Sequence, residues 1–488
     1  MKRLLLLLTM IAAPAAPQHN PVLPGDYPDP SIIRVGGEYW ATATTSAWAP
    51  IFPLLRSVDL KSWTTVGAIF QLRPAWAETH FWAPELAEHN GKYYVYYTAR
   101  KRGGPLCVAV AAAPEPIGPW TDYGPLVCQE AGSIDAVPFN DERGDRYLIW
   151  KEDGNSRKLP TPIWAQRLSD DGLKLTGKPV ELFRNDAPWE GAVVEGSFLV
   201  KRDGWFFMFY SGAGCCGARC NYALGVARSR KLLGPWEKYP NNPLIAGNQE
   251  WTCPGHGSIV ETADGRMFLL YHAYDAKDSI YVGRQGVLDE VTWGADGWPS
   301  INGGKGVSAK TPKPPLPMDE WSWPFDRRGN LALKGDRIEL TAGAGSELAE
   351  AVIARRPVKA SYTASVRVET GSLSGMEVAG LAAYGSARNF VGVFAGGGQV
   401  RLEIRQNGAA KRTAEAPLPK GRSVELRMRV IEGRRFEFAY RGPSGPWQEL
   451  LAPASGEGLP PWDQATRMAL TAGGAPSANV RFRGFRVQ

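Results

Sequence analysis

The chain has 488 residues, of which 44% are hydrophobic and 22% charged, so it can bury more than one core. Its 18 Trp, 17 Tyr and 17 Phe exclude a disordered polymer. Lys and Arg outnumber Asp and Glu by 56 to 49 without a long basic run, which argues against a nucleic-acid partner. After the N-terminus no run of about 18 apolar residues occurs, so we expect no membrane span.

Residues 1–16 have the pattern of a secretory signal peptide. Lys2 and Arg3 give a charged start, an apolar run follows to Ala13, and Ala13-Pro14-Ala15 is a small-residue cleavage site. We therefore expect a periplasmic or secreted protein.

Export would permit disulfides, and all six cysteines precede residue 254. They are Cys107, Cys128, Cys215, Cys216, Cys220 and Cys253. A zinc site is the alternative, but the sequence has no matching pair of C-x-x-C motifs, so disulfides are favoured. We suggest a Cys107–Cys128 bond and leave open whether Cys215 and Cys216 pair with each other.

An aromatic segment that follows a Gly- or Asp-containing turn recurs five times. The copies are GGEYWATATT from Gly36, NGKYYVYYTA from Asn90, RGDRYLIWKE from Arg143, RDGWFFMFYS from Arg202 and ADGRMFLLYH from Ala263. Successive copies are 54, 53, 59 and 61 residues apart, which leaves room for four strands in each unit. This repeat predicts a five-bladed β-propeller over residues 19–300, because a β-helix needs a shorter repeat and a sandwich would not repeat.

The segment before each aromatic strand should be the innermost strand of its blade and line the central channel. An ionisable residue occurs there in every copy: Asp29, Glu85, Asp135, Glu195 and His256. Each has an ordinary explanation when taken alone, such as a turn at Asp29 or a satisfied core histidine at His256. Five such residues facing one channel are costly to bury without a function, so we expect a catalytic pocket on the axis.

Glycosidic cleavage needs two carboxylic acids on opposite sides of a pocket. One protonates the leaving oxygen and the other activates water, with roughly 6.5–9.5 Å between them when the anomeric configuration is inverted. Asp29 and Glu195 come from non-adjacent predicted blades, which favours inversion. Asp135 lies on an intervening blade and could keep the acid protonated through like-charge repulsion.

The strings NPVLPGDYPDPSIIRVGGEYW, IDAVPF, VVEGSF and GHGSIVETADGR resemble glycoside hydrolase family 43 over nearly all of residues 19–300. The resemblance implies an inverting, five-bladed enzyme that acts on arabinose- and xylose-containing glycans. It implies that Asp29 is the general base, that Asp135 tunes acidity and that Glu195 is the general acid.

The resemblance also implies a role for two further residues. Arg284 would contact the innermost sugar, although it could also be a surface strand residue. His256 would lie on the axis near a Ca²⁺ ion or a water molecule, so a structural Ca²⁺ is expected there as the one metal, and no cofactor is expected to be required.

Aromatic side chains near the channel mouth would stack on sugar rings. The candidates are Trp48, Phe81, Trp82, Trp189 and Trp251. Trp82 is favoured because it precedes Glu85, itself a substrate-binding candidate, on an innermost segment. The other aromatic residues could equally belong to the core or to blade edges.

A Cys-rich segment, SGAGCCGARCNYALGVARS, follows the fourth aromatic strand at residues 211–229. A loop stapled by disulfides beside the pocket would shape its entrance rigidly. We hypothesise that this loop restricts the site to chain ends.

Residues 301–318 read as a Gly- and Pro-rich linker, and residues 319–488 as a second strand-rich domain. The alternation VELRMRV from Val424 predicts strands with one buried face, and the whole segment predicts a β-sandwich. It resembles the concanavalin-like domains that follow some family 43 propellers. It could bind glycan or pack against the propeller, and packing is favoured because few exposed aromatic residues are expected beyond Trp321, Trp323, Trp447 and Trp462.

The resemblance and the carboxylates together predict a secreted glycosidase that releases arabinofuranose or xylose from plant-type polysaccharides. An α-L-arabinofuranosidase is the first choice, a β-xylosidase the second and an exo-galactanase the third. From another class, the chain could be a sugar-binding propeller without turnover, and the intact set of three carboxylates argues against that. The sequence specifies no oligomeric state.

Overall fold

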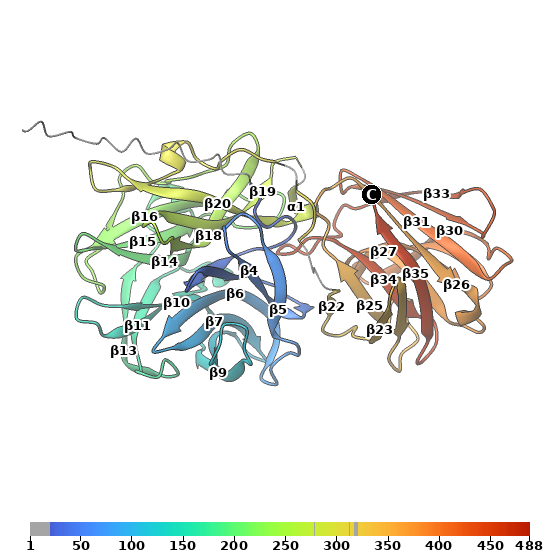
Figure 1. Ribbon diagram of the computed structural model, residues 1–488, viewed down its shortest axis with the longest axis horizontal. Helices are drawn as coiled ribbons and strands as arrows, with labels where there is room; N and C mark the ends of the chain where they lie inside the picture. Colours follow the sequence, from blue (N-terminus) through green and yellow to red (C-terminus); the bar gives the residue numbers. More distant parts are fainter. Residues whose placement is uncertain (1–19, 278, 312, 317–320) are drawn as a thin grey trace, which may run out of the picture.

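The computed structural model describes residues 20–277, 279–311, 313–316 and 321–488 (Figure 1). The expected signal peptide and part of the expected linker lie outside the described residues. Within these residues, no helix has the length and apolar character needed to cross a membrane.

The first part of the chain folds into five four-stranded antiparallel sheets, each built from strands that follow one another in sequence. Blade one contains β1 (Ser31–Val35), β2 (Glu38–Thr42), β4 (Ile51–Ser57) and β5 (Thr64–Phe70). Blade two contains β6 (Ala77–His89), β7 (Lys92–Lys101), β8 (Leu106–Ala113) and β9 (Thr121–Val127). Blade three contains β10 (Ser133–Asn140), β11 (Arg146–Glu152), β12 (Ile163–Leu168) and β13 (Leu175–Phe183).

The last two blades have the same order. Blade four contains β14 (Val194–Arg202), β15 (Trp205–Gly212), β16 (Ala223–Ser229) and β17 (Glu237–Lys238). Blade five contains β18 (Trp251–Glu261), β19 (Met267–Asp275), β20 (Arg284–Trp293) and β21 (Pro299–Ile301). Short helical turns interrupt the loops: η1 (Gly154–Arg157), η2 (Pro188–Glu190), α1 (Ser279–Val282) and η3 (Asn302–Gly304).

The innermost strands β1, β6, β10, β14 and β18 contact one another in ring order around the axis. The aromatic strands lie second in each blade and are buried on both faces, so they pack between neighbouring blades. In one such layer Phe207 and Phe209 of blade four pack with Leu269 and Tyr271 of blade five. Burial of these faces holds the ring together.

The segment just before β1 closes the ring against the last blade. The backbone of Leu23 exchanges hydrogen bonds with Gly286 on β20, at 3.1 and 3.0 Å. The buried Asn20 side chain accepts from the Leu288 N–H (2.8 Å) and donates to the Leu288 carbonyl (3.2 Å). The two ends of the propeller are therefore joined by paired polar groups.

The second part of the chain is a sandwich of two antiparallel sheets. The seven-stranded sheet has the order β23 (Asn330–Lys334), β24 (Arg337–Thr341), β35 (Asn479–Val487), β26 (Tyr362–Glu369), β31 (Ser423–Ile431), β32 (Arg435–Arg441) and β33 (Gln448–Ser455). The six-stranded sheet has the order β25 (Ala351–Arg355), β34 (Arg467–Gly473), β27 (Val378–Ser386), β28 (Asn389–Gly396), β29 (Gln399–Gln406) and β30 (Ala409–Pro417). A turn of 3-10 helix, η4 (Thr370–Ser372), follows β26. The predicted fold class, a five-bladed propeller followed by a β-sandwich, is confirmed.

The two domains share a small sheet in which β3 (Trp48–Ala49) of the propeller pairs with β22 (Trp323–Pro324). Trp48 is 2% exposed and lies under the Arg467 guanidinium of the sandwich, 4.1 Å from its ring centre. Trp48 is therefore part of the domain interface, and not the sugar-stacking residue that the sequence suggested.

Candidate active site

One end of the propeller channel opens into a cavity of about 510 Å³. Its lining includes Asp29, Asp135, Glu195, His256 and Arg284, which come from blades one, three, four and five. The structure thus brings together three carboxylates, an imidazole and a guanidinium that are up to 255 residues apart in the sequence.

The backbone turns these side chains into the cavity by breaking the regular strand pattern. Asp29, Asp135 and His256 have positive φ angles of 50°, 58° and 41°. The pairing register of the inner strands shifts just after Ile134 and just after Glu195. Bulges and left-handed residues re-aim side chains and cost energy, and they occur at sites where function requires the geometry.

Asp29 lies among cations and hydrogen-bond donors. Its carboxylate is 3.1 Å from Nη1 of Arg284 and accepts a hydrogen bond from the Thr44 hydroxyl (2.8 Å). His272 and His256 lie 3.1 and 3.5 Å from the same carboxylate. Burial alone would raise the pKa of Asp29, but Arg284 and the two histidines outweigh it and hold the pKa well below its usual value. Asp29 is therefore ionised, as a base must be.

Glu195 is tied to a buried cation. Nζ of Lys151, which is 1% exposed, donates to Glu195 Oε2 at 2.6 Å and to Asp153 at 3.0 Å. The hydroxyl of the buried Tyr222 donates to Glu195 Oε1 at 2.8 Å. Burial would raise the pKa of Glu195, but Lys151 and the Tyr222 hydroxyl lower it overall.

Asp135 is the third carboxyl group of the pocket, and its pKa is shifted in the opposite direction from those of Asp29 and Glu195. Its Oδ2 accepts the Gly196 N–H (3.1 Å) and is 3.8 Å from Nδ1 of His256. Burial and the nearby Glu195 carboxylate raise the pKa of Asp135 to about 7, although His256 and Lys151 oppose them. The directions of these two pKa shifts favour Asp135 over Glu195 as the carboxyl that holds the proton of the pair. The sequence predicted it on Glu195, because it did not take account of Lys151.

The sandwich domain completes the pocket. Nη2 of Arg284 donates to the main-chain carbonyl of Asp463 (3.1 Å), and the Asp463 carboxylate accepts from Trp82 Nε1 (3.0 Å) and from Ser46 (2.9 Å). The neighbouring Trp462 also lines the cavity and is 59% exposed. The sandwich packs against the propeller, as expected, and it also supplies two residues to the site.

Glu85 lies away from this cavity. It lines a second cavity further along the channel with Ile32, Pro138, Phe198 and Ile259, and it accepts a hydrogen bond from the Ser31 hydroxyl (2.9 Å). Ile32, Pro138, Phe198 and Ile259 each lie three positions after the residue of the same blade that lines the first cavity: Asp29, Asp135, Glu195 and His256. In blade two, Glu85 likewise lies three positions after Trp82. Trp82 is therefore the blade-two residue of the site, and the assignment of Glu85 to substrate was wrong.

Of the aromatic candidates, Trp82 lines the pocket and the others pack elsewhere. Phe81 is fully buried against Tyr97 and Phe52, and Trp251 is fully buried between blades four and five. Trp189 packs on Tyr210 at 5.5 Å. In the sandwich, Trp321 is 6% exposed, and the guanidinium groups of Arg427 and Arg441 each lie 4.4 Å from the centre of the Trp447 ring.

A calcium ion near His256 stays a prediction. Ca²⁺ takes six to eight oxygen ligands. Among the residues that the structure describes, no three His, Cys, Asp or Glu side chains come together as metal ligands. Nδ1 of His256 instead faces the carboxylates of Asp29 and Asp135. No step of the chemistry is therefore assigned to a metal here.

Four residues of the site went unrecognised in the sequence. Lys151 stands directly after Trp150 in a strand that is otherwise buried, and a lysine in such a place was a usable signal. Tyr222 and His272 look like core aromatics, and they stack on each other at 5.7 Å. Asp463 is 434 residues from Asp29, and no local pattern links it to the propeller.

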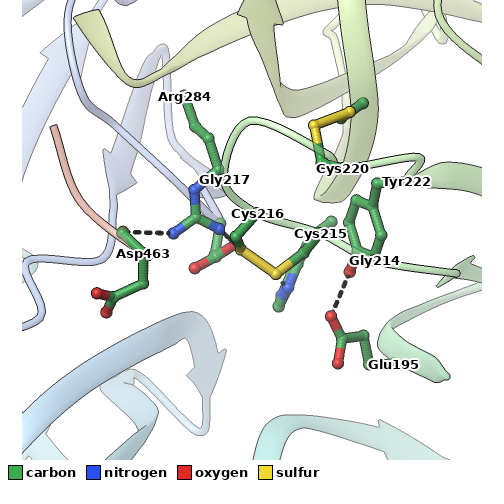
Figure 2. The surroundings of a disulfide bond; sticks show 12 residues. Glu195, Gly214, Cys215, Cys216, Gly217, Cys220, Tyr222, Arg284 and Asp463 are labelled. Atoms are coloured by element: carbon green, nitrogen blue, oxygen red, sulfur yellow. Dashed lines mark hydrogen bonds and ion pairs between the residues drawn. A yellow bond between two sulfur atoms is a disulfide. The ribbon is translucent and has the colours of Figure 1, made fainter. Parts of the chain in front are cut away.

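The three disulfides are Cys107–Cys128, as suggested, Cys215–Cys216 and Cys220–Cys253. The Cys215–Cys216 bond lines the cavity, and Figure 2 shows it between Arg284 with Asp463 on one side and Tyr222 with Glu195 on the other. The Cys-rich loop therefore forms part of the pocket wall.

Carboxylates from separate blades around one pocket are the arrangement that a glycoside hydrolase uses. The sequence model of glycosyl hydrolases family 43 matches residues 18–299. The model of the β-xylosidase C-terminal concanavalin A-like domain matches residues 316–460. The chain belongs to glycoside hydrolase family 43.

Relatives with known names support this assignment. A xylosidase/arabinosidase from Butyrivibrio fibrisolvens is 31% identical over 307 residues, which is 59% of this chain and 57% of that protein. Xylosidase/arabinosidase 43B from Humicola insolens is 27% identical over 86% of both chains. The crystal structure of the family 43 protein BlXynB from Bacillus licheniformis has a TM-score of 0.78 at 24% identity, covering 97% of this chain and 99% of that one, so it shows the same fold.

Asp29 and Glu195 should respond differently to the leaving group. We expect Asp29→Asn to lower kcat about 10²- to 10⁴-fold on every substrate, because water must always be deprotonated. Glu195→Gln should lose as much on a disaccharide but far less on a dinitrophenyl glycoside, whose leaving group needs no proton. Steady-state kinetics on both substrates measures this. Glu237→Gln, on the exposed outer strand β17, is the matched control. Full turnover by Asp29→Asn, or equal losses for Glu195→Gln on both substrates, would contradict the assignment.

Lys151 should set the alkaline limit of activity. The Asp135–Glu195 pair must hold its proton, and the pKa of Asp135 is raised to about 7, so kcat/KM should fall as pH rises through that value. Lys151→Met removes a cation that lowers the pKa of both carboxyls, so the alkaline limb should move up by about one pH unit or more. The pH profile of kcat/KM tests this, with Lys178→Met on the exposed part of β13 as control. An unmoved limb, or one shifted to lower pH, would show that Lys151 does not control the proton.

Proposed function

We propose that the protein is an exo-acting pentosidase that removes terminal xylose from β-xylosides, with terminal α-L-arabinofuranose as a second substrate. The observation that carries this proposal is the pocket of about 510 Å³ that the ionised Asp29 and the Asp135–Glu195 pair line together. Arg284 holds Asp29 in place and gives the innermost sugar a fixed cationic neighbour.

In the proposed reaction, Asp29 takes a proton from the attacking water and Glu195 gives a proton to the leaving oxygen. Asp29 is suited to the first role because its surroundings keep it charged. Glu195 receives its proton within the pair from Asp135, which lies against the Gly196 N–H next to Glu195 in the chain. The water bond to the anomeric carbon forms on the face opposite the bond that breaks, so the product is inverted.

The shape of the pocket supports attack at a chain end. The Cys215–Cys216 loop and the Asp463 segment close two sides of the cavity. On the side of blades two and three the cavity shares Arg100, Leu106, Asp153 and Ser156 with an adjoining groove. A leaving-group sugar can extend along this groove, whereas a chain cannot continue past the disulfide.

The choice of sugar rests on the named relatives and the second domain. Two of the relatives bear both activities in their names, and a further relative, from Bacillus subtilis, is a β-xylosidase that is 28% identical over 76% of this chain. The matched C-terminal domain model is likewise a β-xylosidase domain. On the strength of these similarities we propose xylose before arabinofuranose, the reverse of the order that the sequence motifs suggested.

We also propose that the protein works outside the cytoplasm. The signal-like residues 1–16 motivate this proposal. The pairing of all six cysteines in three disulfides supports it, because disulfides persist in oxidising compartments.

A panel of substrates tests the function. Wild-type protein should release monosaccharide from p-nitrophenyl β-D-xyloside and xylo-oligosaccharides, more slowly from p-nitrophenyl α-L-arabinofuranoside, and should shorten xylohexaose by one sugar at a time. Chromatography of the products with time measures this. Oligosaccharides from internal cleavage would contradict exo action. Release of galactose from galactan would favour an exo-galactanase. If no substrate released sugar, the protein would be a sugar-binding propeller without turnover.

A further inference from the structure

Blade four forms an apolar wall of the pocket. Apart from Glu195, its lining residues are small and uncharged: Val193, Ala213, Gly214, Cys215 and Cys216. The neighbouring blade three contributes Lys151, Asp153, Asn155 and Ser156. On the blade-four side, within the described residues, the Cys215–Cys216 disulfide is the largest polarisable group that faces the cavity.

The loop that carries this disulfide is fixed at several points. Cys220 is bonded to Cys253 on β18, and the Gly217 N–H donates to the Tyr274 hydroxyl (3.3 Å). Gly214 donates to the Asn221 side chain at 2.9 Å and its carbonyl accepts from the Asn221 N–H at 3.0 Å. The disulfide is therefore held in one place before any sugar binds.

The disulfide lies in the lining of the same cavity as the reacting groups. In Figure 2 the two sulfur atoms lie between the Arg284 guanidinium and the Tyr222–Glu195 hydrogen bond. Arg284 also contacts the base Asp29. Asp29, Arg284, Glu195 and both cysteines line the same cavity, so a sugar bound there shares it with the disulfide.

We propose that the Cys215–Cys216 disulfide is the apolar contact surface for the ring of the terminal pentose in this pocket, a part that aromatic rings commonly play in sugar sites. The proposal rests on the exo-pentosidase function proposed above and assigns one wall of its innermost subsite. Sugar rings present C–H groups on their faces, and these groups pack well against polarisable sulfur. Apart from Glu195 the blade-four lining offers no charged group, so the disulfide can contact the ring without competing for the hydroxyls that the carboxylates and Arg284 recognise.

The contact is present in the bound ground state as well as in the transition state. Its loss should therefore weaken sugar binding and raise KM, while kcat changes little. A free monosaccharide that occupies the innermost subsite should lose affinity by the same factor.

The test is the double variant Cys215→Ala/Cys216→Ala, which removes both sulfur atoms and leaves the Cys220–Cys253 anchor in place. KM for p-nitrophenyl β-D-xyloside and the inhibition constant of free D-xylose should both rise about 5- to 30-fold, and kcat should stay within about threefold. The matched control is Cys107→Ala/Cys128→Ala, which removes a disulfide outside the pocket lining and should leave KM and the inhibition constant unchanged.

Each outcome decides between explanations. Unchanged KM and inhibition constant in the pocket variant would overturn the proposal. A fall in kcat with an unchanged inhibition constant would also overturn it and would indicate that the loop acts by positioning Tyr222 and Glu195. Absence of turnover in the wild type would instead refute the pentosidase function, which is measured before the variants are compared.

A second measurement covers the case in which the variant does not fold. A crystal structure of the wild-type protein soaked with D-xylose should show ring carbons in van der Waals contact, about 4 Å, with Sγ of Cys215 or Cys216. A sugar bound among Asp29, Glu195 and Arg284 but separated from both sulfur atoms would contradict the proposal.

Discussion

The buried ion pair between Arg284 and Asp29 is the interaction on which the rest of the site depends. Arg284 begins β20 in the last blade, whereas Asp29 precedes β1 in the first blade, so the pair exists only when the ring is closed. The other arm of the same guanidinium binds the Asp463 carbonyl of the sandwich. The Arg284 side chain thus joins the last blade to the first, joins the propeller to the sandwich, and keeps Asp29 ionised. A buried arginine of this kind is costly unless every partner is present.

A second buried cation, Lys151, determines how the remaining charge is distributed. It pairs with Glu195 and Asp153 and leaves Asp135 as the carboxyl that burial keeps protonated. Three carboxyl groups can share one pocket because Arg284 lies beside Asp29, Lys151 lies beside Glu195, and Asp135 keeps its proton. The energetic problem of burying these acids is therefore solved by the same groups that prepare them for acid and base chemistry.

The repeat of aromatic strands was enough to predict the propeller. Each of the five aromatic strands must be buried on both faces, and a ring of similar blades buries all five in the same way. Asp29, Asp135 and Glu195 could be placed in one pocket for the same reason, whereas Arg284 was placed there by the family resemblance. Glu85 was placed wrongly because β6 contains several register irregularities, and a position inferred from spacing is then displaced along the strand. For Trp48, Phe81 and Trp251 the sequence left core packing and sugar stacking both open, because a tryptophan or phenylalanine is equally expected in a core and in a sugar site. The place of Asp463 and Trp462 in the pocket could not be predicted, since it depends on how the two domains dock.

The central claim is that Asp29 and Glu195 act from opposite sides of one sugar, with a water molecule beside Asp29. The most direct measurement is the anomeric configuration of the first-formed product, followed by proton NMR during rapid hydrolysis of an aryl β-D-xyloside. The geometry predicts that α-xylose appears first and then equilibrates with the β-anomer. Initial release of β-xylose would show retention and a covalent intermediate, and would contradict the roles assigned to both carboxylates.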